Sequence, residues 1–221
     1  MKKLSILTVV LLFAGFTLAQ AQGLREIQLL APDLARSGTM MEALSNRQAI
    51  REFNSRMLTD RDLSDLLWAA NGVNRPDTGG RTAPTGGNSQ DIDIYVIMAQ
   101  GVFLYNAQKH SLEPVVAGDF RAQVIPRQAN VATAPVSLLL VSDTSRFRQS
   151  TRANPTEETI ASLSAIHAGI VAQNISLFCA SAGLVTVITG AIIHTPEEFR
   201  SVIRLRPDQK IVLNLPVGYP R

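Results

Sequence analysis

Two arginines four positions apart are the first side chains along the chain that could bind a ligand. Arg47 and Arg51 flank Ala49 and Ile50 and precede Phe53, so their setting is apolar. Guanidinium groups at this spacing usually form a solvated helix face. An apolar setting could instead hold them against the core, where they would bind a phosphate through paired hydrogen bonds. The pair therefore indicates either a charged helix end or an anion site.

A glycine-rich loop is the second candidate. It has the sequence Pro84-Thr-Gly-Gly-Asn-Ser-Gln90 and lies within residues 73–91, which are rich in Gly, Pro, Thr and Asn. Glycines let backbone amides approach a flat ligand, and Asn88, Ser89 and Gln90 add polar groups. Unstructured loops of this length are often functional. We expect the segment to be either one wall of a ligand site or an ordinary surface loop.

Other catalytic chemistries find no support in the sequence. His110, His167 and His194 are far apart and have no metal-ligand spacing, so we expect each to be structural and predict no metal site. Neither a Gly-x-Ser-x-Gly nucleophile motif nor a glycine-rich phosphate fingerprint occurs. The single cysteine, Cys179, cannot form an internal disulfide, and its apolar surroundings predict a small buried side chain.

Length and composition fit one globular domain. The chain has 221 residues, of which 46% are hydrophobic and 18% are charged, values typical of a folded protein. The formal net charge is only +3, and Lys2 and Lys3 contribute to it. A protein that binds phosphates along a nucleic acid needs a basic stripe, and the sequence has none. We therefore expect no nucleic-acid partner.

Residues 1–21 have the three-part pattern of a secretory signal peptide. Met1–Lys3 is a basic start, Leu4–Leu18 is an apolar run, and Ala19-Gln-Ala21 supplies small residues for cleavage. Because about 20 apolar residues are needed to span a bilayer, export with cleavage is favoured over a membrane anchor. We expect a protein that starts near Gln22, is periplasmic or extracellular, and has no membrane contact after cleavage.

Capping signals and apolar spacing predict four helices in the exported chain, with first residues near Thr39, Thr59, Asn154 and Thr195. The first carries a capping box, Thr39-Met-Met-Glu42, and the second ends near Gly72. The third has Asn154 as N-cap, Pro155 at its first position, and a stop at Gly183. Its length and apolar composition suggest burial on more than one side.

The strand signals complete an α+β class with a mainly antiparallel sheet. Strands are expected over residues 92–98, 102–105, 136–142, 184–189 and 211–215. The first two form a hairpin across Ala99-Gln-Gly101, and the nearly continuous apolar run at 136–142 predicts a central strand. We divide the chain into residues 1–21 (signal peptide), 22–38 (an extended arm) and 39–221 (one domain).

Together these motifs resemble the nitroreductase family of FMN-dependent enzymes. The stretch Arg47-Gln-Ala-Ile-Arg-Glu-Phe53 resembles the family's Arg-x-Ser-x-Arg/Lys-x-Phe motif, whose basic residues bind the FMN phosphate, with Ala49 in place of Ser. Pro84–Gln90 resembles the Pro-Ser-x-x-Asn-x-Gln loop that reaches the flavin from the opposite subunit. Arg81-Thr-Ala-Pro-Thr-Gly-Gly is most similar to the branch of SagB-type dehydrogenases.

The C-terminal half continues the resemblance. The helix with Ala168-Gly169 and Gln173-Asn174 resembles the family's central dimer helix. Ile188-Thr-Gly190 is similar to the segment whose backbone amide contacts flavin N5, although Thr189 stands where some branches have Glu. The ending Val217-Gly-Tyr-Pro220 resembles the closing strand. Many relatives then continue to further basic phosphate contacts, for which Arg221 is the candidate substitute.

The resemblance implies a nitroreductase-like fold with a long central helix at a homodimer interface, and FMN as cofactor. The residues implied to bind FMN are Arg47, Gln48, Ala49, Arg51, Pro84, Thr85, Gly86, Asn88, Thr189, Gly190 and Arg221. No side-chain acid or base is obligatory in this chemistry, because the flavin carries the reaction.

The implied activity is that of an FMN-dependent oxidoreductase. NAD(P)H or another donor reduces FMN, and an electron-poor small-molecule acceptor takes the electrons. The alternatives are a SagB-like dehydrogenase, an exported flavin-binding protein without turnover, and a scaffold that binds no flavin. Ala49, Thr189 and the short C-terminus favour the protein without turnover.

Overall fold

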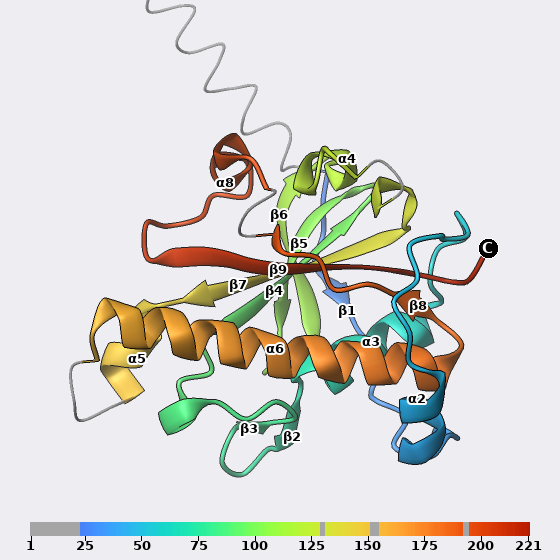
Figure 1. The fold of residues 1–221 in the computed structure, drawn as a ribbon, viewed down its shortest axis with the longest axis horizontal. Coiled ribbons are helices and arrows are strands. Elements are labelled where there is room, and N and C mark those ends of the chain that lie inside the picture. The colour runs from blue at the N-terminus through green and yellow to red at the C-terminus, as the bar shows by residue number, and fades with distance from the viewer. Residues whose placement is uncertain (1–22, 129–130, 151–154, 192–194) are drawn as a thin grey trace, which may run out of the picture.

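A seven-stranded antiparallel sheet with helices on both faces forms the centre of the protein (Figure 1). The computed structural model describes residues 23–221 except 129–130, 151–154 and 192–194. The expected signal peptide therefore lies outside the described residues. The predicted α+β class with a mainly antiparallel sheet is confirmed.

The strand order is β1-β6-β5-β4-β7-β9-β8. The strands are β1 (Ile27–Gln28), β4 (Ile92–Met98), β5 (Gly101–Asn106), β6 (Ser111–Ala117), β7 (Val136–Asp143), β8 (Val185–Thr186) and β9 (Gln209–Gly218). The hairpin of β4 and β5 is confirmed. So is the central place of β7, which lies between β4 and β9 and is buried at every position.

Two strands near one edge of the sheet, β1 and β6, were not predicted. β6 was not predicted, because Pro114 interrupts its pattern and proline cannot donate to a strand ladder. The proline is tolerated here because β1 pairs with Ser111 and Leu112 and, in the part of the chain that the structure describes, no strand pairs with that side of β6 at Pro114. The predicted arm over residues 22–38 contributes β1 and buries Leu29, which ties the arm to the sheet.

The long helix α6 (Glu157–Ala182) ends, as predicted, at Gly183, whose φ of 69° is in the left-handed region. Its predicted start was wrong. Thr156, rather than Asn154, is the N-cap, and its hydroxyl accepts a hydrogen bond from the amide of Thr159. The Thr side chain competes successfully with the Asn-Pro signal because its oxygen reaches the first free amides of the helix.

Two shorter helices begin as predicted. α2 (Met40–Asn46) has a complete capping box between Thr39 and Glu42, and α3 (Asp60–Asn71) is capped by Thr59. In contrast, α8 (Glu197–Val202) has Pro196 at its N-cap and no side-chain cap, so the cap predicted at Thr195 was wrong. The remaining short elements are α4 (Arg121–Val124), α5 (Ser145–Ser150) and η2 (Val131–Thr133).

The glycine-rich segment 73–91 is more structured than its composition indicates. It contains a small hairpin of β2 (Val73–Arg75) and β3 (Gly80–Arg81), followed by the 3₁₀ turn η1 (Gly86–Asn88). The expectation of a long loop without structure was therefore wrong. Gly79, with a φ of 66°, makes the hairpin turn possible.

Each face of the sheet buries its own core, because side chains alternate along the strands. Ile94 and Val96 of β4 pack with α3 and α6. Tyr95 and Ile97 point to the opposite face, where α4, α8 and their neighbours form a second core with Phe199. In Figure 1, α3 and α6 accordingly lie on one side of the sheet and α4 and α8 on the other.

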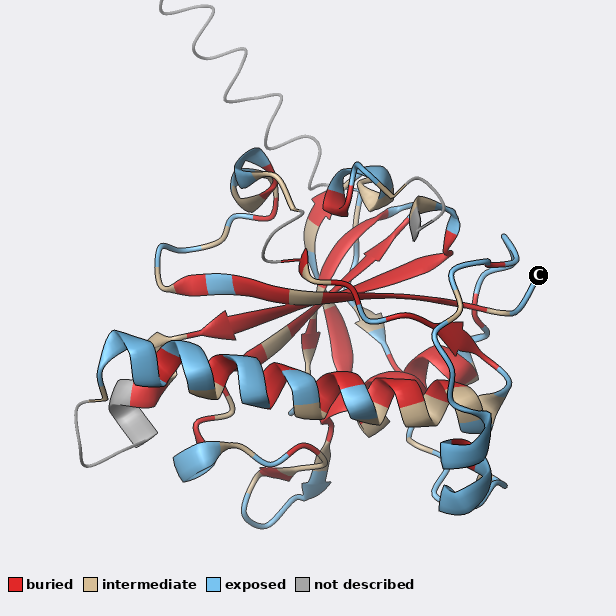
Figure 2. Ribbon diagram, viewed as in Figure 1, coloured by how far each residue is buried: buried red, intermediate tan, exposed pale blue. Residues whose placement is uncertain are grey.

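Only one face of α6 is buried within the protomer (Figure 2). Ala168, Val171 and Ile175 are fully buried, whereas Ile166 is 57% exposed. By length and composition alone α6 could cross a membrane, but its packing against α3 and the sheet is that of a core helix. We expected α6 to be buried on more than one side, and within one chain it is buried on one side.

The packing of α3 predicts the cost of opening a cavity. Leu66 is fully buried, whereas Leu34 in the arm is 77% exposed. We expect Leu66→Ala to lower the free energy of unfolding by about 2–5 kcal/mol and Leu34→Ala by less than about 0.5 kcal/mol. Urea denaturation checks both values. Equal effects at the two positions would contradict the assignment of the core.

Candidate functional site

The predicted phosphate motif forms an extended segment beside β8. Ala49 makes a parallel bridge with Thr186, and the amide of Ile50 donates to the Thr186 carbonyl at 3.0 Å. Arg47, which caps the C-terminus of α2, is exposed, as are Gln48 and Ala49. The segment therefore presents its outer face to solvent next to the strand that leads to residues 189–190.

Arg51 and Arg221 are brought together in one cavity of about 440 Å³. Its lining residues are Arg51, Glu52, Phe53, Asn54, Ser55, Thr133 and Arg221. Two arginines far apart in the sequence thus line one cavity, and guanidinium groups suit the binding of a phosphate. Arg47, the other arginine of the predicted pair, is not among the residues that line this cavity.

Tyr219 fixes the C-terminal segment that carries Arg221. Its hydroxyl donates to Asp62 Oδ2 at 2.6 Å, and its carbonyl accepts from the Asn54 amide at 2.9 Å. The Arg56 guanidinium lies 3.7 Å from the centre of the Tyr219 ring, within range of a cation–π interaction. These contacts join the two chain segments that supply Arg51 and Arg221.

Asp62 is the polar anchor of this junction. Burial raises the pKa of its carboxyl, but hydrogen bonds from Tyr219, Arg36 and Thr59 lower it more, so the net pKa lies below the usual value of 3.8. The Arg36 guanidinium also forms an ion pair with the carboxylate. The ionised form of Asp62 therefore stabilises the fold.

Residues 189–190 are held by the last long strand, β9. The amide and the hydroxyl of Thr189 both donate to the Asn214 carbonyl, at 2.9 and 2.8 Å. Thr189 is buried and Gly190 is half-buried. The Asn214 side chain accepts from Ser137 at 2.7 Å, while its Nδ2 is buried without a hydrogen-bond acceptor among the described residues. The residue whose backbone holds Thr189 therefore also carries a buried donor without a partner among the described residues.

The glycine-rich loop lies on the other half of the molecule, against the N-terminal half of α6. The predicted contact residues here are Pro84, Thr85, Gly86 and Asn88, of which Thr85 is half-buried and the others are exposed. The Gly86 amide donates to His167 Nε2 at 2.8 Å, and the Gln90 amide donates to Thr85 Oγ1 at 2.9 Å. The loop is therefore well anchored although it is exposed.

The two groups of predicted residues do not meet within one protomer. Gln48, Ile50 and Thr186 line a hollow with Cys179 near the end of α6, whereas the loop contacts His167. The rise of an α-helix places positions 167 and 179 about 18 Å apart along the axis. Figure 1 shows the loop below the N-terminal part of α6 and residues 47–56 beyond its opposite end.

The predicted burial of Cys179 is confirmed, and His110 makes two contacts that suit the structural role predicted for it. Cys179 is 1% exposed, and burial raises the pKa of its thiol, as expected of a packing residue. His110 contacts Tyr105 Oη and the Leu30 carbonyl, both at 2.9 Å. His194 lies outside the described residues.

The side chains that position the site are not marked by any motif in the sequence. The Tyr219–Asp62 contact joins residues 157 positions apart, and the His167 contact to Gly86 joins residues 81 positions apart. No local spacing reveals such pairs. The one sequence signal that includes Tyr219 is the ending Val-Gly-Tyr-Pro, which resembles the closing strand of the family.

The Tyr219–Asp62 contact predicts a pH-dependent stability. We expect Tyr219→Phe to lower the free energy of unfolding at pH 7 by about 1–3 kcal/mol, because a buried carboxylate loses a donor. The loss should shrink as the pH falls below about 4, since protonation of Asp62 removes the charge-assisted part in both proteins. Urea unfolding of both proteins at pH 7 and below about pH 4 tests this. An equal loss of unfolding free energy under the two conditions would show that ionised Asp62 does not strengthen the contact with Tyr219.

Comparison with known proteins agrees with this architecture. The nitroreductase family model matches residues 44–219. A protein of Methanocaldococcus jannaschii, provisionally named a nitroreductase, is 30% identical over 204 residues, which cover 87% of this chain and 96% of the relative.

Solved structures show the same likeness. The crystal structure of a protein from Ralstonia eutropha JMP134, also provisionally titled a nitroreductase, has a TM-score of 0.79 at 32% identity and covers 90% of each chain. The NADPH:FMN oxidoreductase of Vibrio harveyi, complexed with NAD+, shares the fold with a TM-score of 0.59 at 20% identity, over 82% of this chain and 68% of that one. The chain described here therefore belongs to the nitroreductase family of oxidoreductases.

Proposed function

We propose that the protein binds FMN between two protomers and uses it to pass electrons from NAD(P)H, or another donor, to an electron-poor small molecule. The observation that carries this proposal is that two arginines, Arg51 and Arg221, line one cavity. The oxidoreductase family and the fold shared with an NADPH:FMN oxidoreductase support it.

The residues present fit a flavin mononucleotide. Arg51 and Arg221 supply the positive charge that a phosphate needs. Exposed Ala49 lies beside Thr186 with a side chain too small to obstruct a flat ring.

Within this arrangement the protein contributes position and charge. FMN, when bound, would supply the hydride and electron transfer. The arginine pair would neutralise the phosphate. Thr189 holds the backbone before Gly190 through two hydrogen bonds to Asn214, so the Gly190 amide is placed without reorganisation, which is the condition for stabilising charge that develops on a ring.

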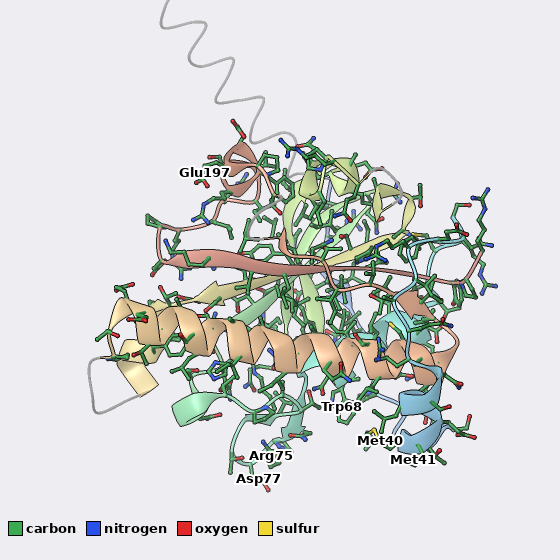
Figure 3. All side chains as sticks on the ribbon, viewed as in Figure 1. Met40, Met41, Trp68, Arg75, Asp77 and Glu197 are labelled. Atoms are coloured by element: carbon green, nitrogen blue, oxygen red, sulfur yellow. The ribbon has the colours of Figure 1, made fainter. Side chains whose placement is uncertain are left out.

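A homodimer is the assembly that completes this site. The outer face of α6 carries Ile166, 57% exposed, and α2 carries Met40 and Met41, 63% and 73% exposed. Figure 3 shows Met40 and Met41 on α2, near the end of α6. Apolar side chains on adjacent helices favour an interface with a second copy. That copy would bring residues 84–90 to the flavin, which one chain alone does not do.

A flavin carrier without turnover is the second candidate. The Thr189 hydroxyl is already bonded to the Asn214 carbonyl at 2.8 Å, so it is not placed to take over the role that a Glu has in some branches of the family. Export through a signal peptide at residues 1–21 would also remove the protein from cytoplasmic nicotinamide pools. A SagB-like dehydrogenase with another electron donor is the corresponding enzyme alternative.

Absorption spectra distinguish these functions. We expect the purified protein to be yellow, and NADH or NADPH added without oxygen to bleach the flavin band. A yellow protein that neither nucleotide bleaches would contradict turnover with NAD(P)H and favour the carrier or the dehydrogenase. A colourless protein that takes up no added FMN would overturn the flavin proposal itself.

Single substitutions in the arginine pair should weaken FMN binding. We expect Arg51→Ala and Arg221→Ala each to raise the FMN dissociation constant about 10- to 150-fold, because each removes a charge-assisted contact of about 1.5–3 kcal/mol. Arg25→Ala, which removes an exposed arginine of the arm, is the matched control and should change binding less than about twofold. Fluorescence titration of FMN measures all three. Unchanged affinity in both cavity variants would refute the phosphate assignment.

The proposed dimer predicts the effect of a charge on α6. We expect Ile166→Glu to shift the protein from dimer to monomer in sedimentation, because an unpaired carboxylate would be buried at the interface. Lys210→Glu, at an exposed position of β9, should remain dimeric. If the Ile166 variant sediments as the unchanged protein does, the outer face of α6 is not the interface.

A further inference from the structure

The loop proposed to face the flavin has an unusual backbone. Gly87, Asn88 and Gln90 have φ values of 61°, 55° and 48°, all in the left-handed region. Only glycine adopts this region freely, so the conformation at Asn88 and Gln90 must be held by surrounding contacts.

His167 supplies one of these contacts from inside the protein. Its ring is 3% exposed and stacks on Phe147, with 5.8 Å between ring centres and an angle of 10°. Nε2 lies 2.8 Å from the Gly86 amide nitrogen. A backbone amide can only donate, so Nε2 must be the acceptor and carry no proton. The proton of the neutral ring is therefore on Nδ1.

Asp91 determines this tautomer. The carboxylate is fully buried, and its Oδ1 lies 2.6 Å from His167 Nδ1. Ser89 donates to the same oxygen at 3.0 Å, and Ser142 of β7 donates to Oδ2 at 2.8 Å. A carboxylate accepts and does not donate, so it retains the proton on Nδ1. Among the described contacts of the His167 ring, Asp91 is the charged group.

This set of bonds connects the sheet and the long helix to the loop. Ser142 Oγ also lies 2.8 Å from Ser164 Oγ of α6, one helical turn before His167. Buried polar groups that satisfy one another in this way fix a single arrangement. The position of Gly86 is thus set by side chains that do not themselves reach the surface of the loop.

We propose that His167 is a positioning residue for the flavin site, whose unprotonated Nε2 fixes Gly86 while Asp91 holds the proton on Nδ1. The inference rests on the proposed function in one respect, namely that the loop contacts the flavin of the partner protomer. His167 touches neither flavin nor substrate in this scheme. Its effect on the reaction passes through the Gly86 amide.

Two substitutions at this position separate the two ring nitrogens. The amide oxygen of Gln reaches about the position of Nε2, so His167→Gln retains an acceptor for Gly86. The amide nitrogen of Asn lies near the position of Nδ1, so His167→Asn retains the donor to Asp91 and loses the acceptor. Both remove the ring and its stacking on Phe147, which makes each the control for the other.

Amide hydrogen exchange at Gly86 is the first measurement. We expect protection of this amide in the unchanged protein and in His167→Gln, and about a tenfold loss in His167→Asn. Long-range ¹H–¹⁵N spectra of the unchanged protein should show a protonated Nδ1 and an unprotonated Nε2. Equal exchange in the two variants, or a proton on Nε2, would overturn the proposal.

FMN titration is the second measurement. We expect His167→Asn to weaken binding about tenfold, equivalent to about 1.4 kcal/mol, and His167→Gln to stay within about twofold of the unchanged protein. Equal weakening in both variants would point to lost packing and would overturn the positioning role. If the unchanged protein binds no FMN, the proposed function fails, while Gly86 exchange still decides whether His167 holds the loop.

Discussion

The distance along α6 is the constraint on which the proposed flavin site depends. The helix packs with one face against the core, and two positions along it support different parts of the predicted site. His167, in the N-terminal half of the helix, holds the glycine-rich loop, while the segment at Ala49 and Thr186 lies beside the C-terminal end. A packed helix cannot shorten, so one protomer cannot close both parts around a single ring. In the dimer that we propose, a second copy would present its loop to the flavin, and the outer face of α6, where Ile166 is 57% exposed, would be the surface that the copy binds.

The side chains described at the site position other groups. Each group described here holds another group in place: Asp62 holds Tyr219, Asn214 holds Thr189, and His167 holds Gly86. In the proposed site the flavin would carry its own reactivity, so the protein would have to supply only a phosphate anchor, a fixed backbone and a dry face. This agrees with a family membership established over residues 44–219.

Local sequence signals predicted the elements well and their contacts poorly. The capping box at Thr39 and the stop at Gly183 appear as predicted, because each depends on neighbouring residues only. The wrong cap at Asn154 and the missed strand at Pro114 arose where two local signals competed. Of the site, the arginine motif and the loop were recognisable as motifs. The family resemblance had named both Arg51 and Arg221 as phosphate contacts. That the two line one cavity, and that His167 contacts Gly86, are properties of the folded chain that no local spacing encodes.

A hybrid dimer tests the shared site most directly. One protomer would carry Arg51→Ala and Arg221→Ala, and the other Gly87→Val, which a φ of 61° disfavours. If each site takes its arginines from one chain and its loop from the other, one site of the hybrid is intact and the other has both defects. We predict that the purified hybrid binds one FMN with nearly unchanged affinity, whereas both parent homodimers bind it weakly. A hybrid that binds FMN no better than its parents would contradict a site divided between two protomers.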